Sequence, residues 1–341
     1  MTVLPISPRI VVLGAGAWGT AIALSMARAG RPVTLWAFTP QLAKEINDAR
    51  ENVQFLPGFP LPERITVTGD DEAVAHGDIL FSVIPSEFLH ATMARLRGHM
   101  HAGQILVSAT KGLEIGTNLR MTQVIASTLA EAGLTDVPVG ALSGPSFAKE
   151  VAEGQPTVVT VAFADHAVAA LVQREVSSET LRLYTSSDVI GVELGGALKN
   201  VIAIAAGIAA GVGLGHNSSA GLITRGIAEI TRLAVACGAR RETLAGLSGL
   251  GDLVLTCTGS LSRNRTVGME LGHGRRLPEI LASLGGKVAE GVLTTRAALG
   301  LARQQRVEMP IAEQMELILE KGKDPREAIR DLMLRPGKHE H

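Results

Sequence analysis

Residues 9–20, RIVVLGAGAWGT, decide the fold of the first half of the chain. The apolar run Ile10–Leu13 predicts a buried strand, and the segment AIALSMARAG that follows the glycines predicts an amphipathic helix. Gly14, Gly16 and Gly19 have the spacing of a dinucleotide-binding turn. The first glycine permits a tight turn, the second lets a pyrophosphate approach the backbone, and the third lets the helix pack close to the strand. We therefore predict that a dinucleotide binds at the start of this helix, where unpaired N–H groups favour phosphate.

Short apolar runs alternate with helical patterns over the first half of the chain, which is typical of a parallel sheet with crossover helices. After about residue 187 the strand-like runs stop, and helical segments rich in alanine and leucine continue to the end. We predict an α/β chain of two domains, a doubly wound dinucleotide-binding sheet over residues 1–187 and an all-helical domain over residues 188–341. The predicted strands are 10–13, 33–36, 65–68, 79–83, 105–108, 139–142, 157–162 and, as a further candidate, 180–184.

The composition limits the range of partners. The 341 residues carry a net charge of −1, so the chain has no basic excess to neutralise nucleic-acid phosphates, although a few local cations would be enough for a small anionic substrate. Cys237 and Cys257 form no CxxC pair and indicate a reducing compartment. The N-terminal residues run directly into the first strand, so we expect no signal peptide. We therefore expect a cytoplasmic protein that acts on small molecules, without nucleic acid or metal.

One long apolar segment raises the question of a membrane span. Residues 200–224 carry no formal charge and are largely apolar or glycine. A membrane helix needs about 20 continuous apolar residues. Glycines and the polar run 216–219 interrupt this segment, and the charged Lys199 immediately precedes it. We predict a buried core helix that ends near Gly213 or Gly215, and no membrane span.

The cofactor preference is expected to be set at the end of the second strand, where an acidic residue would bind the ribose 2′-hydroxyl of NAD. Residues 36–39 read WAFT and contain no carboxylate. Nothing in this segment repels the 2′-phosphate of NADP, but no arginine stands there to bind it. We therefore predict use of both NAD and NADP, with a leaning towards NADP.

Lys199 is the leading candidate for catalysis in the second half. It lies in residues 192–203, VELGGALKNVIA, where Gly195 and Gly196 each weaken a helix by roughly 1 kcal/mol and indicate that something approaches that face closely. As a general acid–base, its amine would donate a proton to a carbonyl. The reverse reaction would need its pKa lowered by about 2–3 units, through burial or a second cation such as Lys111. The alternative is a surface lysine at the edge of a core helix.

Two polar clusters follow. Residues 249–253, GLGDL, place the carboxylate of Asp252 on a glycine turn. Residues 261–265, LSRNR, place a hydroxyl, a guanidinium and an amide at a predicted helix start, which suits an oxyanion and above all a phosphate. The alternative for this segment is an exposed, capped helix with solvated arginines.

Six motifs, in this order and spacing, resemble bacterial NAD(P)-dependent glycerol-3-phosphate dehydrogenase: GAGAWGTA, TKGLE, SGPSFAKE, ELGGALKNVIAIAAG, GLGDLVLTC and SRNR. The resemblance runs from about residue 9 to about residue 334. It implies a Rossmann-type domain followed by an all-helical domain, as in 6-phosphogluconate dehydrogenase. It also implies an oxidoreductase that transfers hydride between NAD(P)H and dihydroxyacetone phosphate, giving sn-glycerol 3-phosphate for glycerophospholipid synthesis.

The resemblance also implies roles for individual residues. Lys199 would bind the substrate and transfer the proton, and Lys111 would contact both cofactor and substrate. In this family Ala17 is often serine and Phe38 is commonly histidine or arginine, so both departures bear on nucleotide binding. The other substrate-binding positions would be Gly144, Ser146, Asp252, Ser262, Arg263 and Asn264, and the cofactor-binding positions Gly14, Gly16, Ala17, Trp18, Gly19, Phe38, Ala148, Arg263, Val288 and Glu290.

Two other functions stay open from the residues. An enzyme of the same two-domain plan would act on a carboxylate such as a 3-hydroxy acid, although the LSRNR cluster speaks against it. A dinucleotide-sensing protein would bind NADPH without needing Lys199. The sequence is also compatible with a homodimer.

Overall fold

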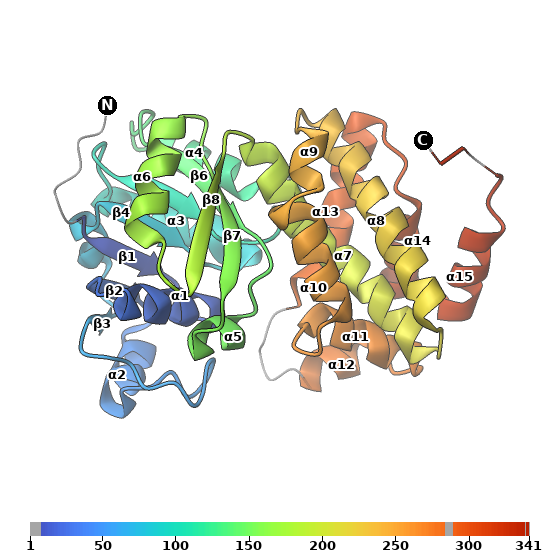
Figure 1. The fold of residues 1–341 in the computed structure, drawn as a ribbon, viewed down its shortest axis with the longest axis horizontal. Coiled ribbons are helices and arrows are strands. Elements are labelled where there is room, and N and C mark those ends of the chain that lie inside the picture. Colours follow the sequence, from blue (N-terminus) through green and yellow to red (C-terminus); the bar gives the residue numbers. More distant parts are fainter. Residues whose placement is uncertain (1–7, 284–288, 338, 341) are drawn as a thin grey trace.

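The structure is a computed structural model that describes residues 8–283, 289–337 and 339–340. A sheet flanked by helices forms one half of the molecule, and a group of packed helices forms the other (Figure 1). The sheet has eight strands in the order β3-β2-β1-β4-β5-β6-β7-β8. The strands are β1 (Ile10–Leu13), β2 (Val33–Trp36), β3 (Ile65–Thr68), β4 (Ile79–Ser82), β5 (Ile105–Ser108), β6 (Val139–Ser143), β7 (Thr157–Ala162) and β8 (Leu181–Ser186).

The strand limits agree closely with those predicted. Five of the eight strands have the predicted ends, whereas β4 ends one residue earlier, β6 ends one residue later, and β8 is shifted towards the C-terminus. The helices that flank the sheet are α1 (Ala17–Arg28), α2 (Pro40–Ala49), η1 (Asp71–His76), α3 (Ser86–Leu96), η2 (Arg97–His99), α4 (Met121–Ala130), α5 (Ala148–Glu153) and α6 (His166–Val176).

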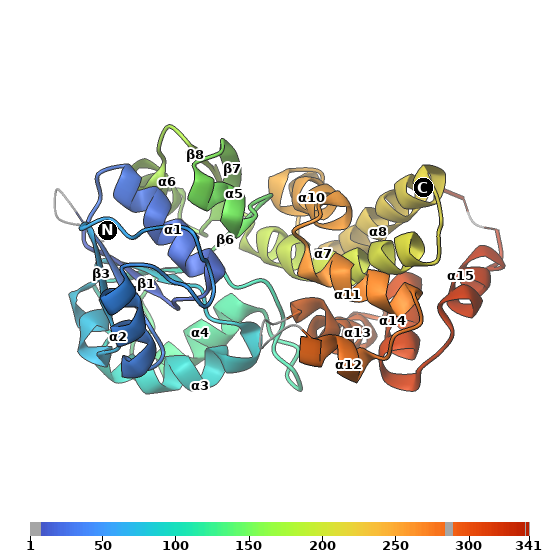
Figure 2. The ribbon, with the colours of Figure 1, turned by 90° about the horizontal axis from the view of Figure 1, so that it is seen from below.

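Both faces of the sheet are covered, which explains the unbroken apolar runs of its strands. Ile10 and Val12 pack in the core beneath α1, α2, α5 and α6. Val11 and Leu13, which point the other way, pack beneath α3 and α4. Figure 2 shows α1 and α5 on one side of the sheet and α3 and α4 on the other.

The pairing of β6 with β7 corrects the prediction of a parallel sheet, because these two strands run antiparallel. The other neighbouring strands are parallel. A parallel neighbour needs a crossover that returns the chain to the opposite edge of the sheet. The connection after β6 contains only the six-residue α5, which spans about 9 Å, whereas a strand of six residues spans about 20 Å. β7 therefore starts at the edge where β6 ends and runs back.

Helix α7 (Val189–Gly211) joins the two halves. In its first turn Val192 forms a buried cluster with Ala141 and Ala162 of the sheet, and its later turns lie at the centre of the helical core. It is long and apolar enough to cross a membrane, and 89% of its most apolar window is buried inside the protein. The predicted core helix is present, but it ends two residues before Gly213.

The remaining helices form the second half of the molecule around α7. They are α8 (His216–Ala236), α9 (Arg241–Leu244), the π-helical turn η3 (Leu247–Gly251), α10 (Asp252–Thr258), α11 (Arg263–Gly272), α12 (Leu277–Ser283), α13 (Glu290–Gln305), α14 (Pro310–Lys321) and α15 (Pro325–Met333).

Glycines let α7 and α11 approach each other closely. A Cβ at Gly207 of α7 would overlap the carbonyl oxygen of Arg265, and a Cβ at Gly268 of α11 would overlap that of Ile204. Gly207, one of the glycines that interrupt the apolar segment, therefore allows two buried helices to pack closely.

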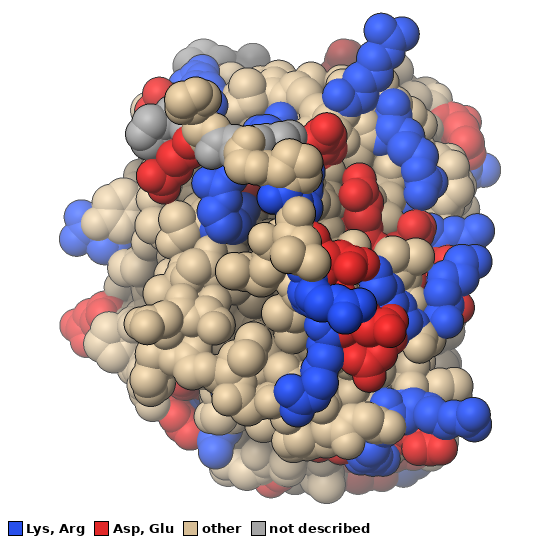
Figure 3. Space-filling view, turned by 90° about the vertical axis from the view of Figure 1, so that its right-hand side faces the viewer, with Lys and Arg blue, Asp and Glu red and all other residues tan. Residues whose placement is uncertain are grey.

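The end face of the helical half carries both signs of charge. Figure 3 shows lysine and arginine interspersed with aspartate and glutamate along the top and right of this face, beside a largely uncharged area left of its centre. In this view the surface offers no uninterrupted basic area to a polyanion, in keeping with the net charge of −1.

Candidate active site

The glycine turn between β1 and α1 has the geometry that its spacing predicted. Gly14 has φ +118°, a conformation that favours glycine, and a Cβ there would lie 2.8 Å from the carbonyl oxygen of Val83. A Cβ at Gly19 would overlap the carbonyl oxygen of Gly14, so the helix packs against the turn itself. At Gly16, the N-cap of α1, a Cβ would meet no described atom within 4 Å. This position is open, as a pyrophosphate at the helix N-terminus requires.

The first turn of α1 also holds a buried donor without a partner. The indole Nε1 of Trp18 is buried, and among the residues that the structure describes it makes no hydrogen bond. Ala17 and Trp18 both pack against the core of the sheet. An open helix N-terminus next to an unsatisfied donor fits a polar ligand such as a dinucleotide.

The end of β2 differs from the prediction in one respect. Phe38 lies two residues beyond this strand and is 54% exposed. Arg95 of α3 donates a hydrogen bond from Nη1 to the carbonyl oxygen of Phe38 (3.1 Å), and its guanidinium lies 5.3 Å from the centre of the Phe38 ring. The prediction that no arginine stands here is therefore wrong, because 57 residues of sequence separate the two and only folding brings them together.

Lys199 and Asp252 form the buried centre of the site. Lys199 is 6% exposed and Asp252 is 1% exposed. The Lys199 amine donates hydrogen bonds to Asp252 Oδ1 and to Thr256 Oγ1 (2.9 Å). The amine of Lys111, in the loop after β5, donates to Asp252 Oδ2 (2.7 Å) and to the carbonyl oxygen of Gly144 (3.1 Å). One carboxylate from the helical half thus holds two lysines, one from each half of the chain.

Burial lowers the pKa of the Lys199 amine from 10.5 to about 8. The Asp252 carboxylate opposes this shift, and repulsion from Lys111 adds to it. The direction of the shift agrees with what acid–base catalysis in both directions requires. The alternative of a surface lysine is wrong, because the amine is enclosed.

The two glycines that precede this lysine let other parts of the protein come close. A Cβ at Gly195 would lie 2.5 Å from the carbonyl oxygen of Ser248 in η3, and a Cβ at Gly196 would overlap a serine hydroxyl at the end of β6. η3 continues directly into α10, whose first residue is Asp252. Close packing at Gly195 therefore places the Asp252 carboxylate beside Lys199, which lies one turn after Gly195 in α7.

Both the nitrogen and the oxygen of the Asn264 side-chain amide form hydrogen bonds with other helices. Its Nδ2 donates to Asn200 Oδ1 (3.0 Å), and its Oδ1 accepts from the backbone N–H of Gly291 (3.0 Å). Asn200 in turn donates to the carbonyl oxygen of Lys111 (3.4 Å). These bonds link α7, α11 and α13 to the loop after β5. Sequence reasoning did not select Asn200, for which the position next to Lys199 was the one available signal.

Helix α11 begins where the LSRNR cluster predicted a helix start. The Ser262 hydroxyl accepts a hydrogen bond from the backbone N–H of Arg265 (3.2 Å) and so caps the helix. Arg263, the first residue of α11, is exposed, and within the described part of the chain its guanidinium makes no hydrogen bond or ion pair. The cap agrees with the alternative of an exposed, capped helix. The free guanidinium of Arg263 is nevertheless available to bind an anion.

Glu290, at the start of α13, adds a second carboxylate to the cluster. Burial raises the pKa of its carboxyl to about 7, against the attraction of Arg263, Lys111 and Lys199. The backbone N–H of Ser86, the first residue of α3, also acts to lower the pKa of this carboxyl, so it lies near the Glu290 side chain. The helical half therefore reaches back to the nucleotide-binding half at this point.

The serine–glycine turn after β6 lies at the same edge of the sheet. Ser146 donates its hydroxyl to the carbonyl oxygen of Gly144 (2.9 Å), the atom that Lys111 also contacts. Ala148 is the first residue of α5. Val288 lies outside the described residues. The Gly144 carbonyl thus joins this turn to the lysine after β5.

An open helix N-terminus at a glycine turn, and an enclosed lysine–carboxylate pair where the sheet meets a helical domain, define a two-domain NAD(P)-dependent oxidoreductase. Residues 9–169 match the N-terminal part of NAD-dependent glycerol-3-phosphate dehydrogenase, and residues 188–330 match its C-terminal part. The chain therefore belongs to the NAD-dependent glycerol-3-phosphate dehydrogenase family.

Relatives cover nearly the whole chain. The glycerol-3-phosphate dehydrogenase (NAD(P)+) of Acidobacterium capsulatum is 58% identical over 97% of this chain and 99% of its own length. That of Geobacter sulfurreducens is 50% identical over 98% and 99%. The crystal structure of glycerol-3-phosphate dehydrogenase from Coxiella burnetii has a TM-score of 0.92 and 38% identity, over 97% of this chain and 100% of that one. The predicted fold class and family are confirmed.

Proposed function

We propose that the protein interconverts dihydroxyacetone phosphate and sn-glycerol 3-phosphate with NAD(H) or NADP(H), and so supplies glycerol 3-phosphate for glycerophospholipid synthesis. The observation that carries the proposal is the enclosed Lys199–Asp252 pair between the two halves of the chain. The bound nicotinamide would supply or accept the hydride at the secondary carbon of the substrate.

Residues of both halves would hold the cofactor. The open N-terminus of α1 suits the pyrophosphate, and the exposed Phe38 ring suits the adenosine side. Glu290 and Arg263 come from the helical half and face the same cluster as Lys111. The proposed cofactor-binding residues are Gly14, Gly16, Ala17, Trp18, Gly19, Phe38, Lys111, Ala148, Arg263, Val288 and Glu290.

Lys199 would move the proton. In the reduction its ammonium donates a proton to the carbonyl oxygen of dihydroxyacetone phosphate, and in the oxidation its neutral amine takes the proton of the hydroxyl group. A pKa of about 8 keeps the amine mostly protonated at neutral pH and its neutral form accessible. Asp252 and Thr256 fix the position of the amine through their hydrogen bonds.

The charges of the cluster suit a phosphate. Arg263, Lys111 and Lys199 are cations, and Asp252 and Glu290 are the opposing carboxyl groups. Because burial raises the pKa of Glu290 to about 7, its carboxyl opposes an anion less than an ordinary glutamate would, and the three cations favour a phosphate dianion. The proposed substrate-binding residues are Lys111, Gly144, Ser146, Lys199, Asp252, Ser262, Arg263 and Asn264.

The two halves of the chain would have different roles in binding. We place the boundary between a cofactor domain, residues 1–187, and a substrate domain, residues 188–341, in the turn between β8 and α7. The protein would act in the cytoplasm on these small molecules.

The direct experiment is oxidation of NADPH by the purified protein with dihydroxyacetone phosphate, repeated with NADH. We expect turnover with dihydroxyacetone phosphate and none with carboxylated ketones of similar length. Turnover with the carboxylated ketones alone would favour the 3-hydroxy-acid alternative. Binding of NADPH without turnover of either substrate would favour a dinucleotide-sensing protein.

A further inference from the structure

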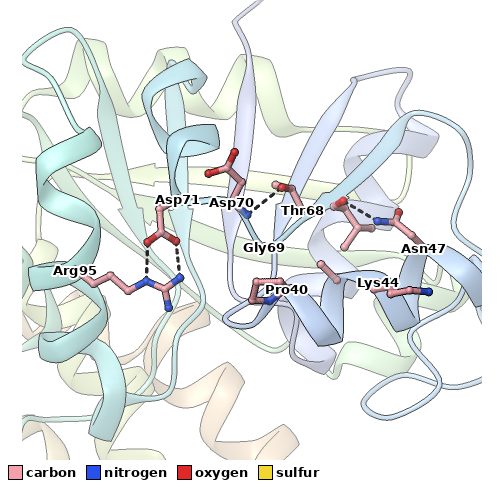
Figure 4. Close-up of a pocket in the computed structure, with 10 residues that line it drawn as sticks. Pro40, Lys44, Asn47, Thr68, Gly69, Asp70, Asp71 and Arg95 are labelled. Atoms are coloured by element: carbon pink, nitrogen blue, oxygen red, sulfur yellow. Dashed lines mark hydrogen bonds and ion pairs between the residues drawn. The ribbon is translucent and has the colours of Figure 1, made fainter.

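A surface hollow of about 700 Å³ opens beside the end of β2 (Figure 4). It lies between α2, the turn after β3 and the side chain of Arg95, and its lining includes Pro40, Lys44, Gly69 and Asp71. The proposed proton transfer does not use these residues. Their position matters because the 2′ substituent of the adenosine ribose lies at the end of the second strand in this type of fold.

Asp71 holds the guanidinium of Arg95 in one orientation. Arg95 Nε donates to Asp71 Oδ2 (2.6 Å) and Nη2 donates to Oδ1 (2.7 Å), the bidentate pair drawn in Figure 4. The guanidinium also lies 5.3 Å from the ring centres of Trp36 and Phe38. Trp36 Nε1 donates to Asp71 Oδ1 (3.2 Å), so the carboxylate is tied to β2 as well. The cation is therefore positioned before any ligand arrives.

The guanidinium of Arg95 has donors left for an anion. A guanidinium carries five N–H groups. Within the described residues Arg95 uses three of them, two on Asp71 and one on the carbonyl oxygen of Phe38. One N–H on Nη1 and one on Nη2 remain, and guanidinium N–H groups of this kind donate charge-assisted hydrogen bonds to phosphate. The side chain is 36% exposed, so these donors are accessible to a ligand.

We propose that Arg95 sets the choice between NADP and NAD by binding the 2′-phosphate of NADP at the edge of this hollow. The inference rests on the proposed function only in requiring a bound dinucleotide. Residues 36–39 contain no carboxylate that would select the ribose 2′-hydroxyl of NAD instead. Asp71 acts as a positioning residue, and its negative charge limits the advantage of NADP, which leaves NAD usable.

The test measures the dissociation constants of NADPH and NADH by nucleotide fluorescence, without substrate. Arg95→Met should raise the Kd of NADPH about 10-fold or more and leave that of NADH within about twofold, because charge-assisted hydrogen bonds to the 2′-phosphate are lost. The matched control is Arg97→Met, whose guanidinium pairs with Glu131 at the surface; it should change neither constant. An unchanged Kd for NADPH would overturn the proposal, and so would an equal rise for both nucleotides, which would make Arg95 merely structural.

Two further measurements distinguish the contact between Arg95 and the 2′-phosphate from the effect of Asp71 on Arg95. Adenosine 2′-monophosphate should compete with NADPH more weakly in Arg95→Met than in the wild-type protein, whereas adenosine 5′-monophosphate should compete equally in both; equal competition by the 2′ isomer would contradict the proposal. Asp71→Asn removes the opposing charge but keeps a side-chain oxygen that can accept a hydrogen bond from Arg95. The ratio of the NADPH to the NADH dissociation constant should therefore fall, and a ratio that rises would contradict the role assigned to the Asp71 charge. Because binding is measured without turnover, failure of the reaction with dihydroxyacetone phosphate is distinguishable from failure of this inference.

Discussion

The amine of Lys199 and the carboxylate of Asp252 form an ion pair that is enclosed between the two halves of the chain. The second oxygen of the same carboxylate accepts a hydrogen bond from Lys111, which belongs to the sheet-containing half. Removing one member of such a buried group leaves a charge without compensation. The Lys111–Asp252 bond therefore joins the two halves, and the Asp252 carboxylate helps set the pKa of Lys199.

Replacing Lys199 by Met should remove most of kcat and leave NADPH binding nearly intact. Positioned acid–base groups contribute about 10²- to 10⁴-fold to rate, and Asp252 keeps Lys111 as a partner in the variant. Steady-state turnover with dihydroxyacetone phosphate and NADPH fluorescence titration measure the two effects. Turnover like that of the wild type would exclude Lys199 as the proton carrier.

Replacing Asp252 by Asn should move the Lys199 pKa below about 8. The carboxylate raises that pKa, whereas burial and Lys111 lower it. Since reduction needs the ammonium form, kcat/KM for reduction should start to fall at lower pH than in the wild type. Asp48→Asn, which removes the surface partner of Lys44, is the control and should leave the profile in place. A shift to higher pH in the Asp252 variant would contradict the assignment.

Replacing Arg263 by Ala should raise KM for dihydroxyacetone phosphate. A hydrogen bond to a charged group is worth about 1.5–3 kcal/mol, which corresponds to about 10- to 150-fold. Arg275→Ala, which removes a surface ion pair with Glu270, serves as the control. If KM does not change in the Arg263 variant, the phosphate binds elsewhere.

Replacing Phe38 by Asp should shift the cofactor preference towards NAD. A carboxylate at the end of β2 would accept the ribose 2′-hydroxyl of NAD, oppose the 2′-phosphate of NADP and neutralise Arg95. The ratio of kcat/KM for NADH to that for NADPH should rise about 10-fold, or about 1.4 kcal/mol. Phe38→Leu introduces no charge and should keep the ratio. An unmoved ratio in the Asp variant would mean that this strand end does not face the ribose.

Replacing Gly268 by Ala should destabilise the protein, because the added Cβ would overlap the carbonyl oxygen of Ile204 in α7. We expect a loss of about 1–3 kcal/mol in the free energy of unfolding, measured with urea. Gly221→Ala in α8 adds a Cβ with no described atom within 4 Å, so it should stabilise by about 0.5–1 kcal/mol. Equal effects of the two changes would show that close helix packing is not the reason for Gly268.

Much of the sheet was predictable because its strands are buried on both faces. Runs such as Ile10–Leu13 have no polar interruption, and glycine or proline ends them. The glycine turn was predictable from its spacing, and a Cβ at Gly14 or Gly19 would meet backbone atoms at close range. The antiparallel direction of β7 was not predictable in this way, because it depends on the distance that the short helix α5 spans between β6 and β7.

The site was only partly predictable. Lys199 and Asp252 were both selected, but their pairing was not, since they are 53 positions apart in the sequence and α7 must pack on η3 before they meet. Arg95 was missed because nothing near residue 95 in the sequence indicates that its side chain reaches the end of β2. Contacts between distant segments depend on tertiary packing, which local patterns do not encode.

The pH dependence of kcat/KM for reduction of dihydroxyacetone phosphate, measured between about pH 6 and pH 10 on the wild-type protein and on Lys199→Met, decides whether Lys199 carries the proton. We predict that the wild-type kcat/KM falls as the pH rises through about 8, the pKa of the enclosed amine, and that the variant keeps a low rate without this ionisation. A wild-type rate that stays constant through pH 8, or the same ionisation in the variant, would contradict it.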